Sequence, residues 1–219
     1  MLKVIRIEKS LFEENEKLAK EVREILNEKN ILSFNIMGSP GSGKTLFIEK
    51  TIENLKEKFN FAVIEGDVEG VIDAEKFKKF NIPVIQINTG GGCHLDANMV
   101  KIGISEIKID EIDILFVENV GNLICPAEFD IGTEKNIVVS SITEGNDKVL
   151  KYPLIFKFSD ICILNKIDLL PYSEFDFGKF KNDLKKISPE TILIKLSSKT
   201  GENFFEWIEY LRRLKKGRK

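Results

Sequence analysis

The sequence contains few of the residues that build disulfide frameworks, and it lacks long apolar runs. Its 219 residues include three cysteines and one histidine. The longest apolar stretches have the length of strands, not the roughly 20 residues of a membrane-spanning helix. Residues 1–10 contain no long apolar run either. Three cysteines cannot form a disulfide framework in a chain of this size. We therefore expect a cytoplasmic protein that is neither secreted nor inserted into a membrane.

The chain also lacks an excess of charge of either sign. Its 33 lysines and arginines nearly balance its 35 aspartates and glutamates, so no overall field attracts nucleic acid. The basic run at residues 212–219 leaves open a regulatory protein that binds RNA or a membrane surface. The simpler interpretation is a solvated tail whose cations suit a helix C-terminus. We expect neither nucleic acid nor a membrane as a partner.

Short apolar runs rich in Ile, Val and Phe alternate with amphipathic, charged stretches, which indicates βαβ units. Apolar residues on one face predict a helix before the first strand, ending near Asn27. No internal repeat or Pro-, Gly- or Ser-rich linker divides the chain. We expect strands at residues 31–37, 61–65, 83–88, 113–117, 136–140, 160–165 and 191–196.

A glycine-rich segment follows the first expected strand, and a helical pattern begins after it at Leu46. The segment reads Gly38-Ser39-Pro40-Gly41-Ser42-Gly43-Lys44-Thr45. This is a complete G-x-x-x-x-G-K-[ST] phosphate-binding loop in its strand–loop–helix setting, and an ordinary glycine turn does not require that pattern. The backbone N–H groups, the helix N-terminus and Lys44 can hold phosphate oxygens, and the Thr45 hydroxyl can bind Mg²⁺.

The motif and the strand pattern together predict an α/β protein with a three-layer P-loop NTPase fold. Its central sheet would be mostly parallel, with about seven strands and helices on both faces. We expect a single domain over residues 1–219, with an N-terminal helical extension over about residues 1–30.

Two segments at the ends of later strands indicate guanine as the base. They read Asn165-Lys166-Ile167-Asp168, which resembles the N-K-x-D motif of GTPases, and Ser197-Ser198-Lys199, which resembles their S-A-K loop. A carboxylate at Asp168 can accept hydrogen bonds from the guanine N1–H and N2–H₂ groups, which adenine does not offer. The sequence therefore favours GTP, and it disfavours the alternative of a P-loop kinase for a small metabolite.

Two carboxylates are candidates for the magnesium and catalytic site beside Lys44. Glu118 begins Glu118-Asn119-Val120-Gly121, which resembles the D-x-x-G switch element, and Gly121 would donate its N–H to the γ-phosphate. Asp67 is a second possible Mg²⁺ ligand, although it is equally suited to a turn. No catalytic Gln or arginine finger is evident, so slow intrinsic hydrolysis is expected. Lys148 and Asp73 remain open as sources of further interactions.

Cys93, His94 and Cys125 are candidates for a transition-metal site. Cys93 and His94 follow an expected strand, and Cys125 lies four residues beyond Gly121. Three N and S ligands suit Zn²⁺ or Ni²⁺ with a fourth ligand from water or a second protomer. The alternative is a glycine turn beside a small buried thiol. Cys162 lies within an apolar strand and is expected in the core.

Three segments carry a family resemblance: residues 38–45, residues 91–97 (Gly-Gly-Cys-His-Leu-Asp-Ala) and residues 118–126 (Glu-Asn-Val-Gly-Asn-Leu-Ile-Cys-Pro). Together they resemble HypB, the hydrogenase nickel-incorporation GTPase family. The related urease accessory GTPases usually carry Cys-Pro-His, whereas Cys125-Pro126 is followed here by Ala127. Residues 1–30 contain no Cys or His, unlike the N-terminal metal sites of many HypB relatives.

The resemblance implies a GTPase that converts GTP and water to GDP and phosphate. It implies a homodimer that forms with GTP and carries Zn²⁺ or Ni²⁺ at its interface. It also implies a HypA-type nickel chaperone and the large subunit of [NiFe] hydrogenase as partners, with nickel insertion as the task. A urease-type nickel accessory GTPase is the neighbouring alternative.

Overall fold

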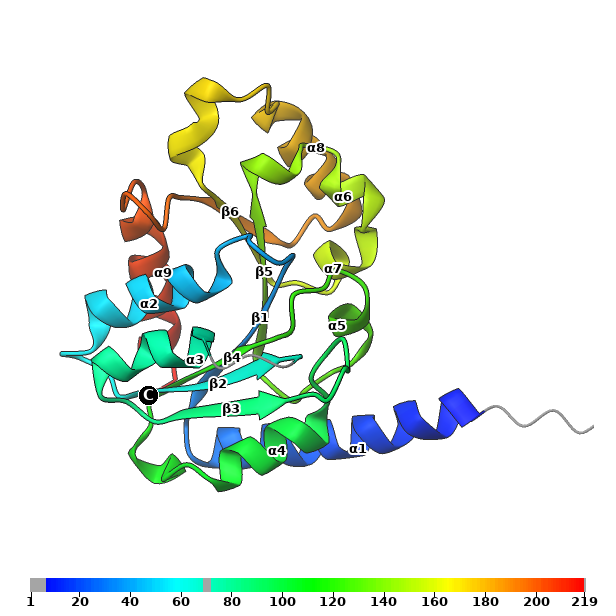
Figure 1. Cartoon of the computed structure of the whole chain (residues 1–219), viewed down its shortest axis with the longest axis vertical. Helices are drawn as coiled ribbons and strands as arrows, with labels where there is room; N and C mark the ends of the chain where they lie inside the picture. Colours follow the sequence, from blue (N-terminus) through cyan, green and yellow to red (C-terminus); the bar gives the residue numbers. More distant parts are fainter. Residues whose placement is uncertain (1–6, 69–71, 219) are drawn as a thin grey trace, which may run out of the picture.

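The structure is a computed structural model that describes residues 7–68 and 72–218. Within these residues, the strands form one seven-stranded sheet in which every pairing is parallel, in the order β3-β2-β4-β1-β5-β6-β7 (Figure 1). The strands are β1 (Leu32–Met37), β2 (Phe61–Asp67), β3 (Val84–Asn88), β4 (Ile114–Glu118), β5 (Lys135–Ser141), β6 (Ile161–Asn165) and β7 (Ile192–Lys195). All seven expected strands are observed, with no end shifted by more than two residues, and the predicted α/β fold is confirmed.

Helices connect the strands and cover both faces of the sheet. The α-helices are α1 (Ile7–Glu28), α2 (Lys44–Leu55), α3 (Ile72–Phe77), α4 (Ala97–Ser105), α5 (Cys125–Glu128), α6 (Lys148–Lys151), α7 (Pro153–Lys157), α8 (Phe177–Ile187) and α9 (Phe204–Lys216). Short 3-10 helices are η1 (Lys78–Phe80), η2 (Ile109–Glu111), η3 (Ile142–Glu144) and η4 (Ile167–Tyr172). Across the described ranges, no helix combines the length and the apolar content needed to cross a bilayer.

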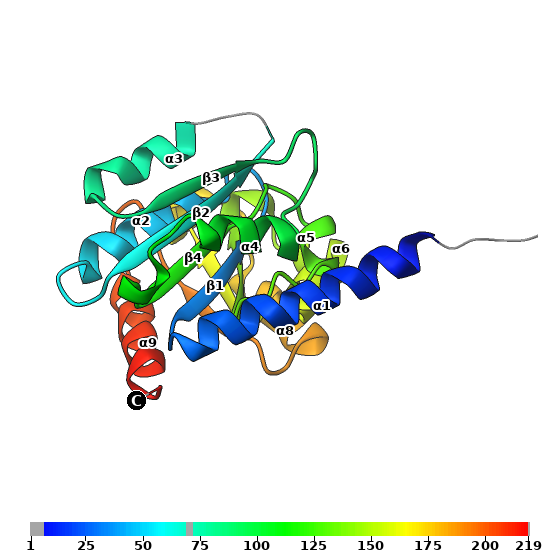
Figure 2. The same cartoon turned by 90° about the horizontal axis from the view of Figure 1, so that it is seen from below.

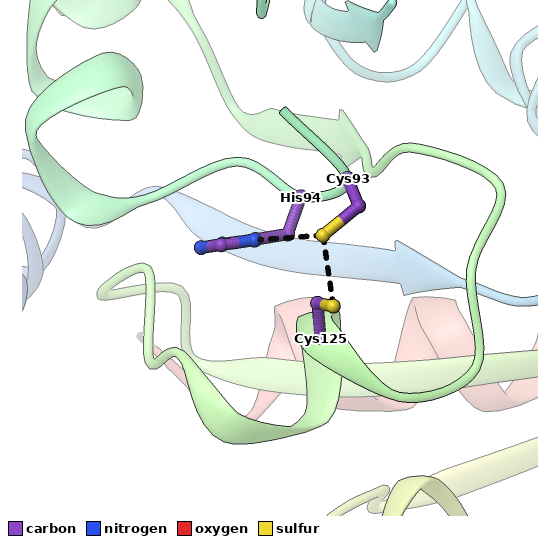
Figure 3. A group of neighbouring side chains, drawn as sticks. All are labelled: Cys93, His94 and Cys125. Carbon is purple, nitrogen blue, oxygen red and sulfur yellow. Dashed lines mark hydrogen bonds between the residues drawn. The ribbon is translucent and has the colours of Figure 1, made fainter. Parts of the chain in front are cut away.

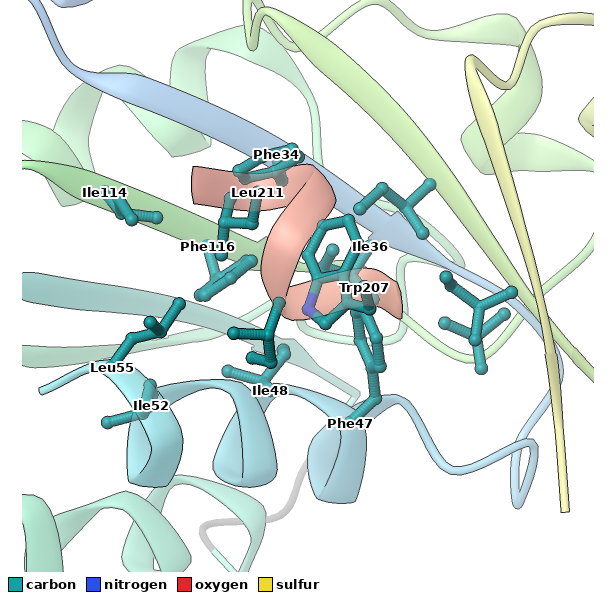
Figure 4. Close-up of a cluster of buried hydrophobic side chains, with 14 of the residues drawn as sticks. Phe34, Ile36, Phe47, Ile48, Ile52, Leu55, Ile114, Phe116, Trp207 and Leu211 are labelled. Carbon is teal, nitrogen blue, oxygen red and sulfur yellow. The ribbon is translucent and has the colours of Figure 1, made fainter. Parts of the chain in front are cut away.

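Alternation along the strands divides the core between the two faces of the sheet. In β1, Phe34 and Ile36 pack with α2 and α9 on one face, in the cluster around Trp207 (Figure 4). In β4, Leu115 and Val117 face the other way and pack with α1 and α4. The β5–β6 half of that second face is covered by α6, α7 and α8. Because successive side chains of a strand point to opposite faces, buried strands with two apolar faces require this three-layer arrangement.

Trp207 lies in α9 and packs this C-terminal helix against α2, the helix that follows the P-loop. Its ring lies 5.0 Å from the ring of Phe47 in α2 and 5.8 Å from that of Phe34 in β1, measured between centroids. Its Nε1 donates to Thr51 Oγ1 at 2.8 Å, and the side chain is fully buried. Burial of a ring with its polar atom satisfied stabilises this contact. The packing therefore holds α2, and with it the P-loop, against the sheet.

The helix α1 runs beneath the sheet beside α4 (Figure 2). Its Asn15 side chain donates to Asp130 O at 2.8 Å and accepts from Ala97 N at 2.9 Å. Arg23 pairs with the Asp130 carboxylate at 2.7 Å. These contacts attach the N-terminal helix to two segments of the candidate site.

The basic C-terminal end is more ordered than the sequence suggested. Most of residues 212–218 belong to α9 or cap it, and they are not a fully solvated tail. Lys215 Nζ donates to Asn30 O at 2.8 Å, and Arg218 pairs with Glu134. Lys215 therefore holds α9 to the turn before β1, and Arg218 holds the residues after α9 to the segment before β5; sequence charge alone does not reveal these roles.

Candidate nucleotide and metal site

The candidate site lies at the carboxyl ends of the central strands, where ligands bind in open parallel sheets. A cavity of about 420 Å³ is lined there by the P-loop, the end of β2 and the segment after β4. Its lining residues include Lys44, Thr45, Asp67, Glu118 and Gly121. The expected magnesium and catalytic residues are therefore brought to one cavity.

The P-loop geometry depends on glycine at two positions. Gly38 has φ of 147°, and a Cβ there would stand 2.3 Å from Val139 O. Gly43 has φ of 99°, and a Cβ there would stand 2.4 Å from Asn165 Nδ2. Both positions combine a left-handed backbone with close packing, which only glycine tolerates. Lys44 Nζ donates to Gly38 O and Ser39 O at 3.3 Å each, so its cation lies over the loop.

Thr45 and Glu118, both expected to bind Mg²⁺, are in direct contact. Thr45 Oγ1 donates to Glu118 Oε1 at 2.8 Å, and Glu118 is only 4% exposed. Glu65 is the register partner of Glu118 on the neighbouring strand β2, is also buried, and lines the same cavity. Hard oxygen donors grouped beside a P-loop are the ligands that Mg²⁺ prefers. The sequence reading missed Glu65, because only the pairing of β2 with β4 brings it next to Glu118.

The two guanine motifs meet each other and the P-loop through Asn165. Its Nδ2 donates to Ser42 O at 3.0 Å, and its Oδ1 accepts from Ser198 N at 3.0 Å. Lys166 lies in the left-handed region with φ of 63° and donates from Nζ to Gly41 O at 2.7 Å. Asn165 and Lys166 therefore fix the loops to one another.

Asp168 has the chemistry of a base ligand. Among the described residues, its Oδ1 is buried and has no hydrogen-bond partner, and the same holds for Ser198 Oγ. A buried acceptor without a donor costs free energy unless a ligand supplies one. The site therefore fits a nucleotide whose base carries hydrogen-bond donors. Lys199, in contrast, is exposed at the surface near Gly201 and is not among the residues that line the P-loop cavity.

Cys93, His94 and Cys125 form one compact cluster (Figure 3). Cys93 Sγ lies 2.8 Å from Cys125 Sγ and 3.6 Å from His94 Nδ1. One ligand atom from each residue lies within 4.8 Å of the others. Two thiols and an imidazole at this spacing fit a borderline-soft metal ion such as Zn²⁺ or Ni²⁺. Cys162 is fully buried in β6, as expected, and lies outside the cluster.

The surroundings of His94 and Cys125 favour the neutral forms of these two side chains. Burial lowers the pKa of His94, against the opposing charges of Asp96 and Glu128. The hydrogen bond with Cys93, followed by burial, raises the pKa of Cys125. Neutral imidazole is the form that binds a metal, whereas the thiol must release its proton on binding. A metal ion bound by this cluster would therefore displace a proton from Cys125.

Two aromatic rings support the His94 imidazole. The Phe129 ring stacks on it with centroids 4.0 Å apart, and Phe12 of α1 stacks on Phe129 at 4.9 Å. Stacking restricts the rotation of the imidazole and so limits where its nitrogens point. No sequence motif indicated this contact, because three separate segments contribute the rings.

The segment between Glu118 and Cys125 joins the nucleotide cavity to the metal cluster. A Cβ on Gly121 would stand 2.8 Å from Pro40 Cγ, so its backbone lies directly against the P-loop. Asn122 forms an isolated bridge with Gly38. The α-helix α5 begins at Cys125, four residues after Gly121. One short stretch of chain therefore contacts the P-loop and carries a cluster ligand.

The strand order explains how Cys93 reaches Cys125. The strands β3 and β4 flank β2, so the loops that follow them leave the same edge of the sheet. The loop after β3 crosses β2 at Gly66, where a Cβ would stand 2.6 Å from Leu95 Cγ. The absence of a side chain at Gly66 lets Leu95 pack over β2.

Of the two open candidates for further interactions with the nucleotide, Lys148 lies beside the P-loop. Its Nζ is 3.5 Å from Ser39 Oγ and 3.5 Å from Glu144 Oε1. The side chain of Asp73 lies outside the described part of the structure. The lysine is thus placed next to Ser39 of the P-loop.

Comparison with known proteins identifies one family. Residues 32–195 match the family model described as CobW/HypB/UreG, nucleotide-binding domain. The chain is 47% identical over 208 residues to the probable hydrogenase maturation factor HypB of Methanocaldococcus jannaschii, covering 95% of this chain and 94% of that protein.

Two crystal structures of HypB share the fold. The HypB of Archaeoglobus fulgidus superposes with a TM-score of 0.86 at 42% identity, covering 92% of this chain and 98% of that chain. The HypB of Helicobacter pylori, solved in complex with nickel, superposes with a TM-score of 0.88 at 35% identity, covering 93% and 96%.

Proposed function

This chain belongs to the CobW/HypB/UreG family, among the HypB hydrogenase maturation factors, and we propose that it is a GTP-hydrolysing metallochaperone for nickel. In this proposal, GTP binding, hydrolysis and dimerisation control the insertion of nickel into [NiFe] hydrogenase. One observation carries it: Cys125 belongs to the metal cluster and stands four residues after Gly121, which packs on the P-loop. A change at the γ-phosphate therefore has a short covalent path to a metal ligand.

The nucleotide chemistry assigned to the site is the hydrolysis of GTP to GDP and phosphate. The P-loop backbone and Lys44 bind the phosphates, and Gly121 N–H contacts the γ-phosphate. Thr45 and Glu118 would hold Mg²⁺, with Asp67 as a further ligand, and the ion would supply positive charge beside the phosphates. Asp168 selects guanine, which is supported by its buried Oδ1.

Nickel is the cargo of the Cys93, His94 and Cys125 cluster, and Zn²⁺ competes for the same ligands. Three protein ligands leave one position of a four-coordinate site for water or for a second protomer. We assign that position to the partner copy in a homodimer that forms with GTP and metal. The nickel complex of the Helicobacter pylori HypB supports nickel as the cargo. A cytoplasmic HypA-type chaperone would supply the ion, and the hydrogenase large subunit would receive it.

Metal titration in two nucleotide states tests the proposal. Titration calorimetry with Ni²⁺ and Zn²⁺ should give different dissociation constants in Mg²⁺–GDP and in a Mg²⁺–GTP analogue. Coupling between two binding sites typically changes the affinity at one of them by about 5- to 150-fold. Cys125→Ala should abolish the difference, because it removes the ligand tied to residues 118–121, the nucleotide-sensing segment.

Cys162→Ala is the matched control. It removes the third thiol of the chain from β6, outside the cluster, and should leave the difference intact. Equal metal affinities in the two nucleotide states of the wild-type protein would refute the coupling. Sedimentation of the wild type with GTP analogue and Ni²⁺ should in addition show a dimer; a monomer under these conditions would remove the assigned fourth ligand.

A further inference from the structure

Asn119 links the nucleotide-sensing segment to the other half of the metal cluster. It directly follows Glu118 in the chain. Its Oδ1 accepts from Leu95 N at 3.0 Å and from Val120 N at 3.0 Å. Leu95 directly follows His94, so this hydrogen bond attaches the backbone next to two cluster ligands to the residue next to Glu118.

The orientation of the Asn119 amide is fixed by its partners. Its Nδ2 donates to Asn35 Oδ1 at 3.1 Å, and Asn35 Nδ2 donates to Asn136 Oδ1 at 3.1 Å. Asn136 Nδ2 in turn donates to Phe158 O at 3.2 Å, which ends the chain on a backbone acceptor. These partners therefore fix which end of each side-chain amide carries the oxygen and which carries the nitrogen. Reversing Asn119 would set its Nδ2 against two backbone N–H donors.

Burial strengthens the hydrogen bond from Leu95 N to Asn119 Oδ1. Asn119 and Asn35 are each 1% exposed and Leu95 is fully buried, so water cannot replace a lost partner. A second link, from Asn122 Nδ2 to Cys93 O, is longer at 3.4 Å and is exposed. Asn119 is thus the stronger of the two side-chain links to the loop that carries Cys93 and His94.

We propose that Asn119 is a positioning residue that ties the Cys93–His94 loop to the nucleotide-sensing segment. This inference rests on the proposed function and extends it. Cys125 follows the segment through the covalent chain, and Cys93 and His94 follow it through the Asn119–Leu95 hydrogen bond. A shift of residues 118–121 then changes the spacing of all three ligands, because the two connections are attached at different points of the segment.

The test compares two asparagine variants. Asn119→Ala removes the acceptor of Leu95 N, whereas Asn136→Ala removes an amide from the same hydrogen-bonded chain without touching the metal loop. For each folded variant, the Ni²⁺ dissociation constant is measured by calorimetry in GDP and in a GTP analogue, together with the affinity for each nucleotide. The ratio of the two Ni²⁺ constants should fall toward one in Asn119→Ala and keep its wild-type value in Asn136→Ala.

The outcomes separate the two proposals. A wild-type ratio of one overturns the proposed function. If the ratio of the Ni²⁺ dissociation constants differs from one in the wild type and Asn119→Ala keeps that value, only the role of Asn119 is overturned. Loss of the ratio in both variants also overturns it, because the effect would then belong to the whole amide chain.

A measurement on the unaltered protein decides the matter if Asn119→Ala does not fold. The proton chemical shift of the Leu95 amide reports the hydrogen bond to Asn119 Oδ1. In the metal-free wild type it should differ between the GDP and GTP-analogue forms. An identical shift in both forms would show that the nucleotide does not reach Leu95, and the inference would fail.

Discussion

Replacing Asp168 with asparagine isolates the choice of base from the stability of the fold. The substitution keeps the size of the side chain and exchanges one carboxylate oxygen for an N–H₂ donor. In the described residues, Asp168 Oδ1 is buried without a partner. The protein alone therefore gains no hydrogen bond from this atom, and losing its acceptor should not lower the free energy of unfolding. The substitution is therefore expected to weaken GTP binding without changing the free energy of unfolding.

The magnitude follows from the hydrogen bonds that guanine offers. Its N1–H and N2–H₂ groups can donate to the two oxygens of one carboxylate, and each bond to a charged group contributes about 1.5–3 kcal/mol. Because the acceptor is already desolvated in the folded protein, little of this gain is offset on binding. Asparagine keeps one acceptor oxygen and loses the other, so the substitution costs about 1.5–3 kcal/mol, which weakens GTP binding by about one to two orders of magnitude. Xanthine carries an oxygen in place of N2–H₂, so it pairs instead with the side-chain amide that Asp168→Asn introduces.

The assay is competition against a fluorescent guanine nucleotide, in magnesium buffer, with GTP, ATP and XTP. The wild type should prefer GTP over both competitors, and Asp168→Asn should prefer XTP. Urea unfolding of the variant, without nucleotide, should match the wild type. A wild type that binds ATP as tightly as GTP, or a variant that still prefers GTP, would refute guanine recognition by Asp168.

The other predictions concern the P-loop and its support. Gly43→Ala places a Cβ 2.4 Å from Asn165 Nδ2 and should abolish GTP binding in the same competition assay. Gly201→Ala shares the positive φ, but its Cβ would meet nothing within 4 Å, so it should retain binding; equal effects of the two substitutions would contradict the steric argument. Thr51→Val removes the acceptor of Trp207 Nε1 and should lower the free energy of unfolding in urea by about 1–3 kcal/mol. A loss below about 0.5 kcal/mol would mean that the buried indole finds another partner.

Local sequence patterns were sufficient for the fold class and for most of the nucleotide site. The strand through Leu115, Phe116 and Val117 was predictable because a buried parallel strand is apolar on both faces. The P-loop was predictable because its contacts with phosphate come from consecutive residues. Its glycine positions were predictable because the loop requires a left-handed backbone that glycine adopts most easily, as at Gly43.

The metal cluster was only half predictable. Cys93 and His94 are neighbours in the chain, so their proximity requires no fold. Their contact with Cys125, 32 residues after Cys93, depends on β3 and β4 lying on either side of β2. Alternation of apolar runs indicates that strands exist, but it does not fix their order, so the sequence could nominate the three ligands without establishing the contact.

By itself, the sequence determined which residues face the two apolar layers and which eight residues form the P-loop, because both depend on periodicity or on the backbone preferences of neighbouring residues. The tertiary structure alone decided that Glu65 stands beside Glu118, that Phe129 stacks on His94, and that Asn119 binds the backbone of Leu95. These contacts join segments whose separation in the chain carries no information about their distance in space. Only strand order and helix packing bring such groups within reach of a hydrogen bond.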